Sequence, residues 1–268
     1  MDLDDADIAA ITALISLERL AALTKLTGSA RAAIELHQET LSLGSNLMGI
    51  IASVEIAIRN AVCENLTTHF GVSGWLTRPV APFRWKDIEN SAAQRALDSA
   101  RRAEYSKMSQ ADKAALDAKA YPRGRPPNTP HMRRAIDRRK QIPVTEGKII
   151  AEITFYFWKR LYGPEYEQSL WRPTLKKTFP NKSLKRSDVA KRLEDVYQAR
   201  NRLAHHEPVL HKRFNDTIAG LEFIAENLLA PAPAKDTPLA KLIADDLQRV
   251  KDNAQALHDK LDAFRTGP

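Results

Sequence analysis

The sequence is poor in cysteine and in long hydrophobic runs. Cys63 is its only cysteine, so no intramolecular disulfide can form and a four-cysteine zinc site is excluded. A reducing compartment is the simplest environment for such a chain. The first residues, Met-Asp-Leu-Asp-Asp, lack the basic start of a signal peptide, and no apolar run approaches the roughly 18 residues of a membrane span. We therefore expect a cytoplasmic protein that does not enter the membrane.

Strand patterns are missing as well. No alternation of apolar and polar residues persists along the chain, whereas helical spacing recurs. Hydrophobic residues make up 43% and charged residues 28%, the balance of an ordinary globular protein. With 268 residues the chain can bury a full core, as one large domain or one domain with appendages. These features predict an all-α fold.

The positive charge is concentrated in one stretch. The net charge is +8, and residues 84–140 hold 15 Lys/Arg against 7 Asp/Glu, while the rest of the chain is balanced at 26 against 26. Such a surplus favours an anionic partner. Prolines punctuate the same stretch, and residues 121–130 lack apolar periodicity, which is typical of a loop. We interpret residues 79–145 as a basic, proline-containing insertion with a helix around residues 92–103.

Helical spacing predicts three helices before the insertion and four after it. The expected ranges are 8–26, 29–43 and about 45–66, then about 145–161, 187–206, 213–229 and 237–268. Gly28 follows the first helix and is interpreted as a stop, and Ser45, after Gly44, is interpreted as the cap of the third. The helix in 145–161 carries a bulky aromatic face that must be buried, with the third helix as the expected partner.

The expected organisation is a helical domain over residues 1–230 with a C-terminal amphipathic helix over 236–268. Thr237 is the predicted N-cap of that helix, with Pro238 in its first turn. Its apolar residues alternate four and three apart, a spacing that allows pairing with a second copy. Packing back on the same chain is the alternative.

The string Arg200-Asn201-Arg202-Leu203-Ala204-His205-His206-Glu207-Pro208 places two arginines and two histidines in the last two turns of one predicted helix. At about 100° per residue, Arg200 lies on the apolar side of that helix. A buried guanidinium needs a partner, and Glu55 on the third helix, one turn before Arg59, is the expected one. The alternative is that this ion pair only locks two helices together.

The two histidines point to proton transfer, because imidazole can give and take protons near neutral pH. In a straight helix His205 lies about 140° from Arg200. Local unwinding near Pro208 would bring His205 to the inner groove. Completion of the site by a second subunit is one alternative, and a plain helix-capping role for the histidines is another.

Two motifs carry a resemblance to a known family. Arg200-Asn201-x-x-x-His205 resembles the R-x4-H motif of HEPN ribonucleases, and its His-His-Glu-Pro extension resembles the Abi-like (phage abortive infection) family. The segment 54–61, with Glu55 and Arg59, resembles the E-x3-R helix of related HEPN toxins. Further matches fall in the same order along the chain, at residues 16–20, Phe70-Gly71 with Trp75, 149–158 and Leu170-Trp171. The resemblance covers roughly residues 15–225 and leaves out the basic insertion and the C-terminal helix.

The resemblance implies a HEPN-like helical bundle that cuts RNA without a metal ion or cofactor, as a toxin in antiviral defence. His205 would take the proton of a ribose 2′-hydroxyl, with His206 in reserve for the acid step. Arg200, with Arg59, would stabilise charge on the phosphoryl oxygens, Asn201 would orient His205 or the phosphate, and Glu55 would hold Arg200. The products would be a 2′,3′-cyclic phosphate and a free 5′-hydroxyl.

The expected partners are RNA and a second copy of the chain, since HEPN enzymes usually form dimers. In the basic insertion, the residues expected to grip the RNA backbone are Arg101, Arg102, Arg133, Arg134, Arg138, Arg139 and Lys140. A solvated surface without RNA is the alternative for this insertion. For the whole protein, the alternative is an RNA-binding or scaffolding protein that does not cut, for example one that binds an RNA antitoxin.

Overall fold

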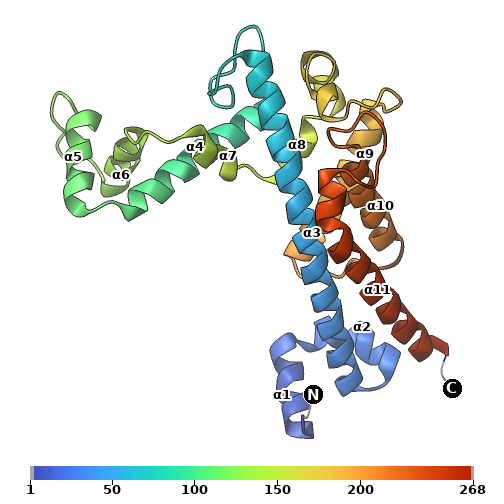
Figure 1. The fold of residues 1–268 in the computed structure, drawn as a ribbon. Coiled ribbons are helices and arrows are strands. Elements are labelled where there is room, and N and C mark those ends of the chain that lie inside the picture. The colour runs from blue at the N-terminus through green and yellow to red at the C-terminus, as the bar shows by residue number, and fades with distance from the viewer. Residues whose placement is uncertain (1–2, 267–268) are drawn as a thin grey trace. The chain divides into compact units, whose positions relative to one another are not determined.

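The computed structural model describes residues 3–266, which form eleven α-helices and no strand (Figure 1). The all-α class is confirmed. The helices are α1 (Asp5–Ile15), α2 (Leu17–Thr27), α3 (Ala30–Phe70), α4 (Asp87–Lys107), α5 (Gln110–Ala120), α6 (His131–Lys140), α7 (Glu146–Ala151), α8 (Phe155–Arg160), α9 (Arg186–Ala204), α10 (His211–Asn227) and α11 (Pro238–Thr266). Short 3-10 and π turns lie between α8 and α9.

The helices divide into two compact units. The first unit comprises the chain up to Ala61, residues 162–164, and the chain from Lys176 onward. The second unit comprises residues 62–161 and 165–175. The basic insertion expected over residues 79–145 lies in the second unit, and the C-terminal helix lies in the first.

The chain before α3 forms two helices where the sequence predicted one. The break falls at Ser16, whose backbone has φ 86°, in the left-handed half of the map. The Ser16 hydroxyl accepts a hydrogen bond from the Arg19 backbone N–H and so caps α2. A serine in the middle of an apolar periodic run gave no signal strong enough to predict this break.

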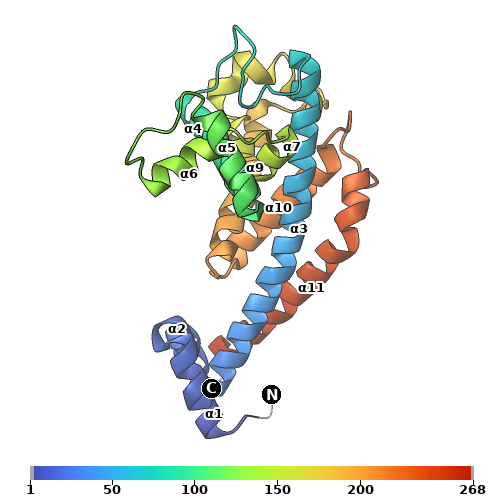
Figure 2. The same cartoon turned by 90° about the vertical axis from the view of Figure 1, so that its left-hand side faces the viewer.

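The predicted break at Gly44, with Ser45 as the cap of a new helix, is wrong, because α3 continues through both as one helix of 41 residues. A Cβ atom at position 44 would lie 3.0 Å from Cδ2 of Leu203 on α9. Gly44 therefore permits a close approach of α3 and α9 and does not end a helix. Figure 2 shows α3 as an unbroken rod.

By length and composition α3 could cross a membrane, contrary to the expectation that no stretch is long and apolar enough. Of its 18-residue apolar window, 33% is buried inside the structure. Leu47, Ile51, Val54 and Ile58 recur on one face and are all fully buried in the first unit. Each such side chain contributes about 1.5–3 kcal/mol when it leaves water. The core helix of a soluble protein can meet the same criteria.

The first unit is built around the packed pair α9 and α10. The apolar stripe of α9, represented by Val189, Leu193 and Val196, is fully buried, as its spacing predicted. Gly220 of α10 faces this stripe so closely that a Cβ would lie 3.0 Å from Val196 Cγ2.

The C-terminal helix α11 packs back on its own chain. The Thr237 hydroxyl accepts a hydrogen bond from the Ala240 backbone N–H at 3.0 Å, which confirms the predicted N-cap. Contacts with α10 and α2 bury its apolar stripe, and Lys260 forms an ion pair with Glu39 of α3 at 2.6 Å. Figures 1 and 2 both show α11 running beside the first part of α3. The stripe that could have paired with a second copy is thus occupied within this chain.

The second unit has an aromatic core. The predicted helix over residues 145–161 is broken into α7 and α8, and the Phe157 ring lies 5.4 Å from Trp85, centroid to centroid. Glu89 of α4 is fully buried beside this core. Its carboxylate is paired with Arg160 and accepts a hydrogen bond from the Tyr166 hydroxyl at 2.7 Å. Burial raises the pKa of Tyr166, so the phenol stays protonated and can donate this bond.

Candidate functional site

The end of α9 is a Schellman turn formed by the residues that the sequence singled out. The backbone N–H of Glu207 donates to the carbonyl of Arg202 at 2.9 Å, and that of His206 donates to Leu203 at 3.0 Å. His206 occupies the left-handed position of the turn, with φ 57°. Glycine is usual there, but histidine is among the residues that tolerate this conformation. The helix therefore ends at Ala204, two residues earlier than predicted, and both histidines lie outside it.

Arg202 holds this turn in place. Its guanidinium forms an ion pair with Glu207 at 2.9 Å, and its Nε donates to the Pro208 carbonyl at 3.4 Å. In most Schellman turns an apolar contact joins the corresponding two side chains, and here an ion pair replaces it. Pro208 cannot continue a helix, so the chain leaves the turn in one direction.

Both imidazole rings are available for chemistry. His205 and His206 are exposed, and within residues 3–266 neither ring has a hydrogen-bond partner. Their backbone groups do form hydrogen bonds. The His205 N–H donates to the carbonyls of Asn201 and Arg202, and the His206 carbonyl accepts from Arg19. The turn fixes the two backbones and leaves the rings free.

Arg200, Arg59 and Glu55 are brought together inside the first unit. All three side chains are half-buried. Burial raises the pKa of the Glu55 carboxyl, while the nearby guanidinium groups of Arg200 and then Arg59 oppose that rise. The three charges therefore lie within electrostatic range, but in the described part of the chain Glu55 and Arg200 form no ion pair within 4 Å.

The two guanidinium groups are poorly satisfied. Arg59 Nε is buried and has no hydrogen-bond partner. Neither Arg59 nor Arg200 has an ion-pair partner among residues 3–266. Glu55 lies near both groups but forms no ion pair with either, so a bound anion would find unsatisfied donors here. Asn201 follows Arg200 on α9 and is also half-buried.

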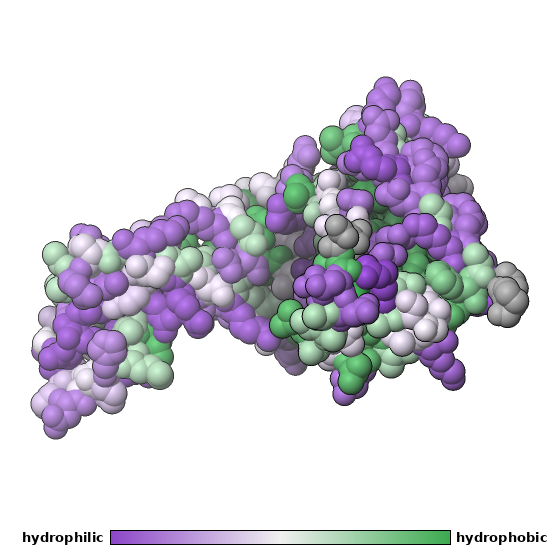
Figure 3. Space-filling view, turned by 90° about the horizontal axis from the view of Figure 1, so that it is seen from below, coloured by the Kyte–Doolittle hydropathy of each residue, from purple (hydrophilic) through white to green (hydrophobic). Residues whose placement is uncertain are grey.

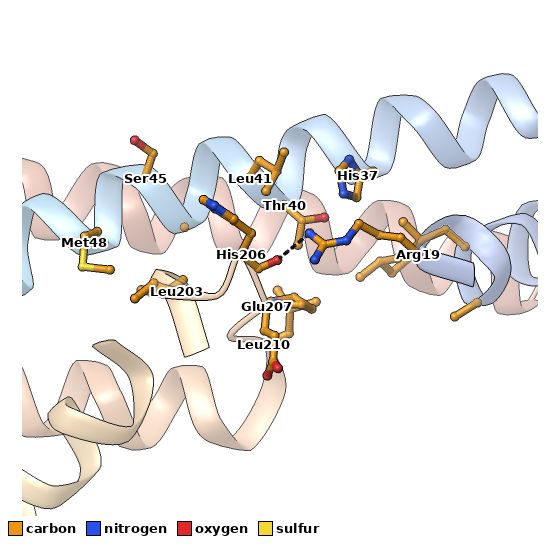
Figure 4. A pocket seen from close by; sticks show the side chains of 16 residues that line it. Arg19, His37, Thr40, Leu41, Ser45, Met48, Leu203, His206, Glu207 and Leu210 are labelled. Atoms are coloured by element: carbon orange, nitrogen blue, oxygen red, sulfur yellow. Dashed lines mark hydrogen bonds between the residues drawn. The ribbon is translucent and has the colours of Figure 1, made fainter. Parts of the chain in front are cut away.

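A pocket of about 730 Å³ opens beside the turn in the first unit (Figure 4). Its lining residues include Arg19, His37, Thr40, Leu41, Gly44, Ser45, Met48, Leu203, Ala204, His206, Glu207, Pro208, Leu210 and Leu261. His206 is thus the histidine that lies at the pocket. Neither His205 nor Arg200 belongs to its lining, so the expected convergence of Arg200 and a histidine does not occur in this pocket.

Arg19 and His37 were not among the residues predicted for the site. Arg19 Nη1 donates to the His206 carbonyl at 3.3 Å, and Nδ1 of His37 is buried without a partner. Burial, and then the charge of Arg19, lower the pKa of His37. The sequence gave one signal, since Arg19 lies in a segment that resembles the Abi-like family. The sequence gave no signal for His37, which is a lone histidine within an apolar helix.

The basic insertion contains structural ion pairs. Arg138 of α6 is only 8% exposed and binds Asp117 of α5 at 2.6 and 2.8 Å. Arg134 binds the same carboxylate at 3.0 Å. These bonds lower the pKa of Asp117 and raise those of both arginines. Because both guanidinium groups bind one carboxylate, Arg134 and Arg138 join α5 to α6, and the three groups together keep one positive charge.

Other basic residues of the insertion remain accessible. Arg102 and Lys140 are exposed, and the Arg133 side chain is 65% exposed although it pairs with Asp137. Arg139 is half-buried, and so is Arg101, whose Nε is buried without a partner. Hydrophilic residues cover most of the face of this region seen in Figure 3. A positively charged, solvated surface is present here.

Comparison with known proteins does not assign the chain to a family. No protein-family model, curated protein or solved structure matches the chain. Among residues 3–266, the His, Cys, Asp and Glu side chains form no group of three or more that could hold a metal ion. The resemblance to the Abi-like family therefore stays a prediction from the two sequence motifs.

Proposed function

We propose that this chain is a metal-independent endoribonuclease with a HEPN-like fold, of the Abi-like type, that acts on RNA in the cytoplasm as an antiviral toxin. One observation carries the proposal. Two half-buried guanidinium groups without ion-pair partners, Arg59 and Arg200, occur with two exposed imidazoles, His205 and His206, that no other group binds. A phosphodiester accepts hydrogen bonds from the two guanidinium groups. Its cleavage needs proton transfer, which the two imidazoles provide.

The guanidinium groups supply charge stabilisation. A phosphate placed between Arg59 and Arg200 accepts charge-assisted hydrogen bonds, which are stronger than neutral ones. The bonds strengthen as negative charge grows on the phosphoryl oxygens during attack, a contribution of about 3–4 kcal/mol for a well-placed donor. Glu55 keeps the two arginines from repelling each other when RNA is absent.

The imidazoles move the protons. His205 accepts the proton of the ribose 2′-hydroxyl, and the 2′-oxygen then forms a bond to the adjacent phosphorus. The bond from phosphorus to the 5′-oxygen breaks, and His206 in its protonated form gives that oxygen a proton. The products are a 2′,3′-cyclic phosphate and a 5′-hydroxyl. DNA lacks the attacking hydroxyl and is not a substrate.

The proposed enzyme is a homodimer. His205 lies beyond the end of α9, the helix that carries Arg200, and the pocket that contains His206 is not lined by Arg200. A second copy offers the complementary half, so that the arginines of one subunit and the histidines of the other face one phosphodiester.

The basic insertion would hold the rest of the RNA. The candidates are Arg101, Arg102, Arg133, Arg139 and Lys140, together with Arg134 and Arg138, which share the single carboxylate of Asp117. Their charge acts on the phosphate backbone and does not select a sequence.

The test is incubation of the purified protein with total RNA in EDTA. Wild type should cut, and Arg200→Ala and His205→Ala should not. Arg249→Ala and His69→Ala, which replace exposed residues remote in sequence from the motif, serve as matched controls and should cut normally. Cleavage that survives both motif substitutions rules out this site, and cleavage that EDTA abolishes rules out the metal-free route.

A second candidate function is RNA binding without cleavage, as a scaffold or as the partner of an RNA antitoxin. The basic surface of α4 to α6 favours it independently of the histidines. Retention of RNA by a protein that cuts in neither EDTA nor Mg²⁺ would establish this function in place of the first.

A further inference from the structure

The pocket beside His206 has the form of a small-molecule site. One wall is a single face of α3, on which the lining residues recur every three or four positions from His37 to Met48. Leu203, Leu210 and Leu261 come from three other segments of the first unit. A volume of about 730 Å³ falls in the range of sites that enclose small organic ligands.

The pocket is polar at one end and apolar at the other. Figure 4 shows Arg19, His37 and Thr40 on one side of His206, and Met48 and Leu203 on the other. From residue 37 to residue 48 the wall of α3 rises by ~16 Å. The walls between these ends are mostly aliphatic, and the only aromatic rings among the lining residues are the two imidazoles.

No carboxylate of the described residues pairs with Arg19 at the polar end, since Glu207, which also lines the pocket, is paired with Arg202. Arg19 has no ion-pair partner within residues 3–266, and its one hydrogen bond of the side chain goes to the neutral carbonyl of His206. Beside it, His37 Nδ1 is buried and unbonded. An anionic group at this end would pair with the guanidinium and offer His37 an acceptor.

We propose that this pocket binds an amphipathic carboxylate with an aliphatic chain on the order of ten carbons, the length that C–C bonds of about 1.5 Å allow along the wall. The carboxylate lies at Arg19 and His37, and the chain lies along Leu41, Gly44 and Met48. A nucleotide is a poorer fit, because the lining offers no large aromatic face on which a base could stack.

Occupancy would act on the ribonuclease, and this part rests on the proposed function. The same guanidinium that receives the carboxylate donates to the His206 carbonyl. A carboxylate competes for that donor, since a charged acceptor is stronger than a neutral one. The turn that carries His205 and His206 then loses one of its anchors, and decanoate should change the rate of RNA cleavage.

Isothermal titration calorimetry with decanoate, without RNA, tests the site. Wild type should bind one decanoate per chain, and Arg19→Gln should weaken that binding at least tenfold. Lys25→Gln, an exposed charge on the same helix, is the matched control and should bind as wild type. The neutral analogue 1-decanol should bind wild type and Arg19→Gln equally. Leu41→Trp, which fills the aliphatic part, should abolish binding of both compounds.

Thermal unfolding of each variant shows that it is folded. Absence of saturable decanoate binding to wild type overturns the proposal. So does equal binding by Arg19→Gln and Lys25→Gln, or binding that Leu41→Trp leaves unchanged. A protein that binds decanoate as expected but cuts no RNA contradicts the proposed function alone, because calorimetry reports the pocket directly.

Discussion

The Arg202 guanidinium lies 2.9 Å from the Glu207 carboxylate, while the Glu207 backbone N–H donates to the Arg202 carbonyl, also at 2.9 Å. Side chain and backbone thus join the same two residues across the turn that carries His205 and His206. Two residues that flank the histidines fix their backbone without touching their rings. The dense charge of this string predicted a catalytic site. Two of its charged residues, Arg202 and Glu207, instead fix the geometry of the turn.

Replacement of Glu207 by Gln should separate these two roles. The pair is partly exposed, so a double-mutant cycle with Arg202→Gln should give a coupling energy of about 0.2–1 kcal/mol in urea denaturation. Cleavage should fall further, by roughly tenfold or more, because a catalytic group displaced by about 1 Å can lose ~100-fold in rate. Unchanged cleavage in a destabilised Glu207→Gln protein would show that the turn does not position the histidines.

Substitution of His206 by Gly should maintain the stability of the fold but reduce RNA cleavage. At φ 57° a glycine is free of the steric cost that a side chain bears, about 1 kcal/mol. The melting temperature of His206→Gly should therefore equal or exceed that of wild type, whereas His206→Ala should melt lower. RNA cleavage should fall by roughly 100-fold or more in both, the usual contribution of a general acid. Full activity in His206→Gly would remove this histidine from the mechanism.

The contact between α9 and α10 depends on Gly220. A Cβ there would lie 3.1 Å from the Arg192 backbone carbonyl oxygen, which cannot move aside. Gly220→Ala should cost about 1–3 kcal/mol of unfolding free energy, although alanine favours helix. Gly49→Ala is the matched control on α3, where a Cβ meets nothing within 4 Å, and should add about 0.5–1 kcal/mol. Equal effects in denaturant titrations would contradict the close packing.

His37 should make stability depend on pH. Burial, and secondarily Arg19, hold its pKa below the ordinary value of 6.5 in the folded protein. The unfolded chain therefore binds the proton more readily, and the stabilisation that is present above pH 6.5 is lost as the pH falls through the folded-state pKa. Wild type should lose more stability than His37→Gln between pH 7.5 and 5.

NMR titration of the His37 ring gives its folded pKa directly. Arg19→Gln should raise that pKa, because a nearby positive charge is removed, yet leave it below 6.5, because burial is the larger cause. A folded pKa at or above 6.5 in wild type would mean that the ring is solvated and the pocket open.

Much of the fold follows from spacing in the sequence. The stripe of α9, the Thr237 cap and the ends of α9 and α10 were predicted to within about two residues, because apolar periodicity and end signals are local. The prediction of a helix break at Gly44 failed because a glycine can end a helix or permit a close helix contact. The position of Leu203 shows that the second role applies.

The site was predicted less completely than the fold. The proximity of Glu55, Arg59 and Arg200 was expected, because the apolar stripes of α3 and α9 determine which faces meet. The left-handed backbone at His206 and the pairing of Arg134 and Arg138 with Asp117 were not, since they depend on neighbours distant along the chain or on one backbone angle. The proximity of Arg19 and His37 was not predicted, because it depends on how α2 packs against α3.

The most direct test of the central claim uses a DNA oligonucleotide that contains one ribonucleotide, incubated with the protein in EDTA and analysed by mass spectrometry. Cleavage only on the 3′ side of that ribonucleotide is expected, with a 2′,3′-cyclic phosphate on one product and a 5′-hydroxyl on the other. Cuts at deoxynucleotides, or a product with a 3′-hydroxyl and a 5′-phosphate, would contradict attack by the ribose 2′-hydroxyl and the ribonuclease mechanism with it.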